Sequence, residues 1–73
     1  MISTARRADG AIVVREIDPA GERCWLFHPV RPGAPARIST AVNGHKGPFV
    51  ALGHGSAPAR IVLAATAAGW GCP

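Results

Sequence analysis

Residues 11–28 read AIVVREI, DPAG and ERCWLFH in succession, and this stretch decides the fold. The two outer runs are rich in β-branched and aromatic residues, which is typical of strands. Between them, Asp18 occupies the first position of a type I turn, proline the second and Gly21 the fourth. The pattern therefore predicts a β-hairpin that pairs residues 11–17 with residues 22–28.

The second strand of this hairpin carries apolar groups on both faces. Successive side chains of a strand point to opposite sides, so Trp25 and Phe27 share one face while Cys24, Leu26 and His28 share the other. A strand with one solvated face would alternate apolar and polar residues. We therefore expect residues 22–28 to form a central strand or one that is covered on both sides.

A second hairpin is predicted downstream of a proline-rich loop. Residues 29–35 contain three prolines and form a surface loop. Residues 36–42 alternate apolar and polar side chains, which indicates a half-buried strand. After a glycine-rich turn, residues 48–52 form a short apolar strand that begins with a proline, where proline is tolerated.

The C-terminal part of the chain favours a helix. Residues 57–68 are rich in alanine, with Ser56 placed as an N-cap and Gly69 as a C-cap. The run Ile61–Leu63 also suits an extended chain, so a fifth strand is the competing interpretation. The expected fold class is α+β, with two β-hairpins in a four-stranded antiparallel sheet and a C-terminal helix. The alternative is an all-β five-stranded small barrel.

The length of the chain predicts one small domain spanning residues 1–73. Residues 1–9 are expected to be a flexible lead-in and residues 70–73 a short tail. The longest apolar run, 61–68, is too short to span a bilayer. With no secretory pattern at the N-terminus, we expect a cytoplasmic protein with no membrane contact. A core this small makes a homodimer a reasonable hypothesis.

Charge is distributed unevenly along the sequence. The net charge is +4 and the pI is about 10.6, which favours anionic partners. Residues 23–73 contain no Asp or Glu. Carboxylates orient catalytic histidines and act as general acids and bases, so we expect no enzymatic activity and no cofactor. The same segment holds the cations that we expect to bind a partner: Arg23, Arg31, Arg37, Lys46 and Arg60.

The sequence contains residues suited to three further kinds of site. Cys24 and His28 would lie about 13 Å apart along a strand, too far for one metal ion, so no metal site is expected. Gly53, His54, Gly55 and Ser56 precede the predicted helix and form a candidate anion cradle, although glycines commonly serve turns alone. Trp25 and Phe27, beside Arg23, are candidates for stacking on bases, although a small core also needs large aromatics.

The leading functional hypothesis is a small, basic, non-enzymatic protein-binding module. It would act as an inhibitor or adaptor on an acidic patch of a larger protein partner. Heavy use of Ala, Gly, Pro and Arg is typical of a GC-rich bacterial or phage gene. The alternative is a small nucleic-acid-binding protein that uses the dispersed cations and the aromatic strand.

Overall fold

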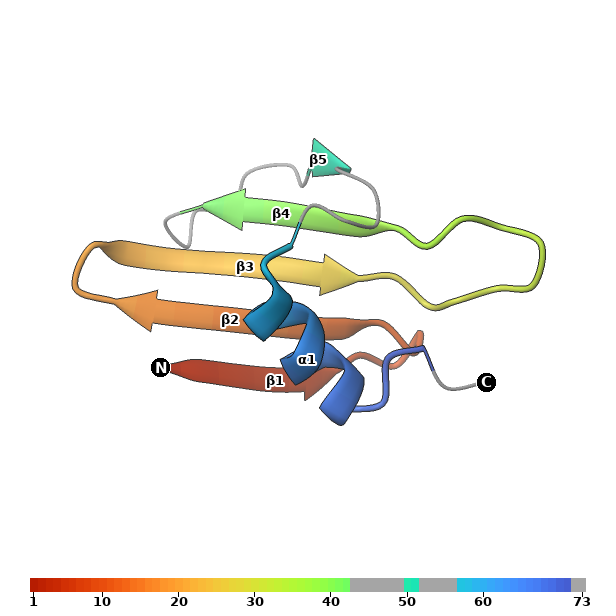
Figure 1. Cartoon of the computed structure of the whole chain (residues 1–73), viewed down its shortest axis with the longest axis horizontal. Helices are drawn as coiled ribbons and strands as arrows, with labels where there is room; N and C mark the ends of the chain where they lie inside the picture. Colours follow the sequence, from red (N-terminus) through yellow and green to blue (C-terminus); the bar gives the residue numbers. More distant parts are fainter. Residues whose placement is uncertain (43–49, 52–56, 72–73) are drawn as a thin grey trace.

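The computed structural model describes residues 1–42, 50–51 and 57–71, which form one antiparallel sheet and one helix. Figure 1 shows the helix lying across one face of the open sheet. The predicted α+β class is confirmed, and the described sheet is not closed into a barrel. The elements in chain order are β1 (Ile2–Arg6), β2 (Ile12–Asp18), β3 (Gly21–Phe27), β4 (Ile38–Val42), β5 (Val50–Ala51) and α1 (Ala59–Ala67).

The hairpin predicted from residues 11–28 is present as β2 and β3. Asp18 pairs with Gly21 across the two-residue turn. The Asp18 carboxylate accepts hydrogen bonds from the backbone N–H groups of Ala20 at 2.8 Å and Gly21 at 3.1 Å, which is how an aspartate fixes a turn at its first position. Strand β3 is the central strand of the five, as its two apolar faces predict.

The predicted lead-in is instead a strand, which corrects the sequence analysis. Strand β1 pairs with β2 from Ile2 opposite Glu16 to Arg6 opposite Ile12, and it forms one edge of the sheet. All five of its side chains are exposed. Because no buried face imposes an alternating pattern on these residues, the sequence alone gives no strand signal there.

The second predicted hairpin is present with shorter strands. Strand β4 pairs with β3 beyond the proline-rich loop, and β5 pairs with β4 through Ser39 opposite Ala51 and Thr40 opposite Val50. Most of the predicted strand 48–52 and the turn before it lie outside the described residues.

Helix α1 ends as predicted, at a glycine. Gly69 has a φ of +111°. Its N–H donates to the carbonyl of Thr66, and the N–H of Trp70 donates to the carbonyl of Ala65, both at 3.0 Å. These two bonds are the Schellman motif, which satisfies the last carbonyls of a helix. At the other end the N-cap is Pro58, without a side-chain cap; the predicted cap, Ser56, lies outside the described residues. No helix in the described ranges has the length and hydropathy needed to cross a bilayer.

The core lies between α1 and the sheet. The rings of Phe27 and Trp70 meet edge to face with centroids 5.0 Å apart, a favourable arrangement for aromatic pairs. Trp70 also donates from Nε1 to the carbonyl of His28 at 2.9 Å. Trp70, assigned to a tail from the sequence, is therefore a core residue that fastens the end of α1 to the sheet. The same buried cluster contains Ile12, Val14, Trp25, Phe27, Ile38, Ala57, Ile61 and Ala65.

Candidate anion-binding site

A concave surface lies where β3 ends and β4 begins. Figure 1 shows residues 28–37 extending beyond the sheet at this end. The N–H of His28 donates to the carbonyl of Arg37 at 3.1 Å and closes the loop at its base. Residues of the loop line an open pocket of about 280 Å³, which we call the loop-end pocket. No acidic residue lines it; the lining residues are His28, Pro29, Arg31, Ala34, Pro35 and Arg37.

Within the described residues, no carboxylate pairs with either of the two arginines of the loop-end pocket. All four acidic side chains of the sequence lie in the described ranges, and each is already engaged. Asp18 holds the β2–β3 turn, while the others pair with Arg7, Arg15 and Arg60. Arg31 and Arg37 are both exposed. Their guanidinium groups are therefore available to an external anion.

His28 forms the half-buried wall of the pocket. Its Nε2 atom shares a hydrogen bond of 2.8 Å with Oγ of the buried Ser39. Burial lowers the pKa of the His28 imidazole, and the positive charges of Arg37 and Arg7 lower it further, against the opposing effect of Asp9. The ring is consequently neutral at pH 7. The positive charge of the pocket comes from its arginines alone.

A second, shallower concavity of about 220 Å³ adjoins the loop-end pocket through Pro29. It includes Arg6, whose Nη2 atom donates to the carbonyl of Ala68 at 3.2 Å. Arg7 lies close enough to His28 to affect its pKa. Arg6 and Arg7 are not among the predicted partner-binding cations, because residues 1–22 carry four acidic side chains against three arginines. The sequence feature that could have pointed to these two arginines is that they are adjacent.

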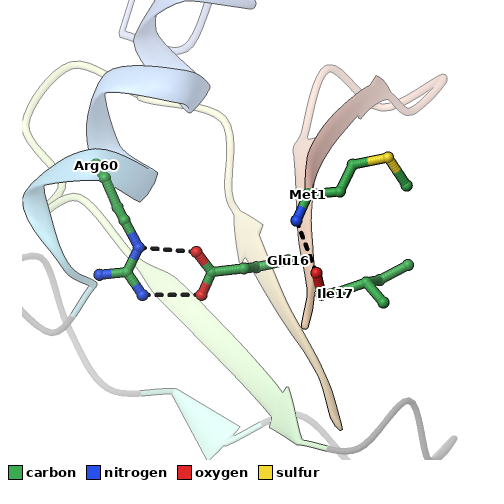
Figure 2. A network of polar contacts seen from close by, with 4 residues as sticks. All are labelled: Met1, Glu16, Ile17 and Arg60. Carbon is green, nitrogen blue, oxygen red and sulfur yellow. Dashed lines mark hydrogen bonds and ion pairs between the residues drawn. The ribbon is translucent and has the colours of Figure 1, made fainter. Parts of the chain in front are cut away.

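The predicted partner-binding cations do not form a single surface. Arg31 and Arg37 meet at the loop-end pocket. Arg60 instead forms a two-point contact with Glu16 of β2, at 2.7 Å and 2.8 Å, as Figure 2 shows. Arg23 pairs with Glu16 across β3 and β2, which puts it about 17 Å along β3 from the pocket. Lys46 lies outside the described residues.

Trp25 and Phe27, the candidates for stacking on bases, are instead buried core residues. Trp25 is 5% exposed and Phe27 is 0% exposed. Both rings pack in the core, where no base can reach their faces. The candidate cradle of residues 53–56 lies outside the described residues. Within the described ranges, no three His, Cys, Asp or Glu side chains gather closely enough to hold a metal ion.

Comparison of this chain with protein-family models, curated proteins and solved structures found no match.

Proposed function

We propose that this protein is a small, non-enzymatic binding module that takes an acidic segment of a larger protein partner into the loop-end pocket. Arg31 and Arg37 supply the contacts. The observation that carries the proposal is the pair of exposed guanidinium groups around a concavity without carboxylates. Arginine binds carboxylates with two parallel hydrogen bonds, which gives geometric specificity as well as attraction. A module of this kind acts as an inhibitor or an adaptor.

The distribution of charge favours a protein partner over a nucleic acid. Single-stranded nucleic acids need a cationic groove that follows the backbone, together with exposed aromatic rings. Here Arg23 and the Arg60–Glu16 pair lie at the opposite end of β3 from Arg31 and Arg37. Both strand aromatics are buried. A compact anionic feature, such as neighbouring Asp or Glu side chains, fits one pocket better than an extended phosphate chain does.

The test is a titration of the ¹⁵N-labelled chain with a hexaglutamate peptide, followed by amide NMR. We expect shifts centred on His28, Arg31 and Arg37. Arg31→Glu and Arg37→Glu should each weaken binding by about tenfold or more, because reversal puts a negative charge against the peptide. Arg23→Glu makes the same change in net charge away from the pocket and should weaken binding far less.

Parallel titrations with single- and double-stranded oligonucleotides separate the two classes of partner. If oligonucleotides bind and the logarithm of affinity falls with the logarithm of salt concentration at a slope of about −3 to −4, some four phosphates are neutralised. That result would replace the protein partner with a nucleic acid. Equal losses from Arg23→Glu and Arg37→Glu would show that net charge, and not the pocket, governs binding.

A further inference from the structure

In strand β1, the backbone hydrogen-bonding groups of three of the five residues are left unpaired by the described residues. Met1 and Ile17 exchange hydrogen bonds, with the Met1 amine donating at 2.7 Å and the Ile17 N–H at 2.8 Å; Figure 2 shows the first of these bonds. At the other end of the strand, the N–H of Arg7 donates to the carbonyl of Ala11. Hydrogen-bonded pairs alternate along an antiparallel ladder. Ser3 and Ala5 therefore bond to β2, whereas the N–H and C=O groups of Ile2, Thr4 and Arg6 point away from the sheet.

This edge carries few of the features that keep natural sheet edges from pairing. Such edges usually carry proline, lysine, a bulge or an inward-pointing charge. Strand β1 reads ISTAR and pairs with β2 without interruption. Its one charged side chain, Arg6, bonds to the carbonyl of Ala68 at the end of α1.

Exposed apolar side chains also gather at this edge. The described residues include five exposed large hydrophobic side chains, and three of these lie at or beside this edge. One precedes β1, one belongs to β1 and one belongs to the neighbouring strand β2. They are Met1 at 82%, Ile2 at 40% and Ile17 at 41% exposure. Contact with a second strand would remove part of this surface from water, which is favourable.

We propose that two copies of this chain pair antiparallel through β1, about a two-fold axis at Thr4, and join their sheets edge to edge. In this register Thr4 faces its own copy and Ile2 faces Arg6 of the second copy. The outward N–H and C=O groups of all three residues then bond to one another. A shift by one residue would set outward groups against groups already bonded to β2, and a shift by two would leave one of the three outward residues without a strand partner.

The side chains of β1 are compatible with a second copy of the chain paired along this edge. In the proposed register, Ser3 lies opposite Ala5, both small, and a threonine pair meets at the axis, a favourable cross-strand combination. Between residues 2 and 6 of the two copies, no two like charges face each other. A two-fold axis requires such self-complementarity, since each residue meets its counterpart in reverse order. The axis places the two loop-end pockets at opposite ends of the joined sheet.

Sedimentation and amide hydrogen exchange test the dimer together. We expect the mass to rise with concentration from 7.5 kDa toward twice that value. Protection at Thr4 and Arg6 should rise in parallel, while protection at Ser3 and Ala5 stays constant. Added salt should strengthen the dimer, because each copy carries a net charge of +4. A chain that stays monomeric at millimolar concentration, or a Thr4 amide whose exchange ignores concentration, would overturn the proposal.

Complementary variants distinguish a lost interface from a lost fold. Thr4→Lys places two like charges across the axis, as does Thr4→Glu, and each should weaken self-association by about tenfold or more. A mixture of the two variants should restore it as a heterodimer, which requires both variants to be folded. A dimer that neither variant weakens would place the interface elsewhere on the molecule. Binding of an unrelated strand peptide in preference to the second copy would refute the assigned occupant.

Discussion

His28 makes the stability of the fold depend on pH near neutrality. Burial, with Arg37 and Arg7, lowers the pKa of its imidazole in the folded chain below the ordinary 6.5. Above about pH 6.5 the ring is neutral in both states, so it gives no pH dependence there. As the pH falls below that value, the unfolded chain takes up the proton first. The free energy of unfolding must therefore decrease.

We expect urea denaturation midpoints to fall between pH 7.5 and pH 5.5, and His28→Gln to remove most of that fall. Glutamine can still bond to Ser39, so the variant isolates the titration from the hydrogen bond. An NMR titration of the His28 ring gives the direct reading. Arg37→Gln should raise the pKa of His28 part of the way toward its ordinary value. An equal pH dependence in wild type and His28→Gln would contradict this assignment.

For individual residues, the sequence predicts some members of the candidate site correctly and others wrongly. Arg31 and Arg37 are predicted to bind a partner because they lie in a segment without acids, and in the described part of the chain no carboxylate pairs with them. Arg60 was selected on the same ground, yet it pairs with Glu16, 44 residues earlier in the chain. Charges segregated along a sequence can meet in space. Trp25 and Phe27 fit either a stacking platform or a core, and only their burial decides between the two.

The elements were predictable where the signal is local. Asp18 and Gly21 flank a turn that fixes the β2–β3 hairpin, and Gly69 stops α1 close to the predicted end. Strand β1 was missed because its strand character arises from pairing with β2, a non-local contact that leaves no buried periodicity in ISTAR. Trp70 was missed for a related reason. A tryptophan after a helix-ending glycine looks terminal until the Schellman turn directs it into the core.

The end of α1 should be sensitive to a side chain at Gly69. Its φ of +111° strains any other residue, and an added Cβ atom would meet Nη2 of Arg6, so that the end of the Arg6 side chain would have to move. We expect Gly69→Ala to lower the free energy of unfolding by more than about 1 kcal/mol, measured by urea denaturation. Gly71→Ala is the control, since Gly71 also has a positive φ but open space around it. A smaller loss at Gly69 than at Gly71 would show that Arg6 and the helix end adapt freely.

On the scale of the whole molecule, polar contacts hold both ends of α1 against the sheet. Near its start, Arg60 bonds to Glu16 of β2, with the Glu16 side chain only 13% exposed. Just beyond its end, Arg6 of β1 reaches the carbonyl of Ala68, where a cation also suits the helix dipole. Between these contacts lies a core that is small because the chain is small. Loss of either contact should therefore affect the docking of the whole helix on the sheet.

The Glu16–Arg60 contact should govern stability in acid. Hydrogen bonding to Arg60 lowers the pKa of the Glu16 carboxyl below the ordinary 4.5. The unfolded chain therefore binds the proton first as the pH falls. The stabilisation is complete above about pH 4.5 and is lost as the pH falls through the lowered pKa of the folded chain. We expect Glu16→Gln to be less stable than wild type at pH 7 and to show a flatter decline below pH 4.5, measured by thermal melting.

Arg60→Gln should reproduce this profile, and the double variant should add little to either change, because one interaction is removed in all three. Additive losses would show that the two side chains stabilise the fold separately, and that the contact between them does not clamp the helix to the sheet.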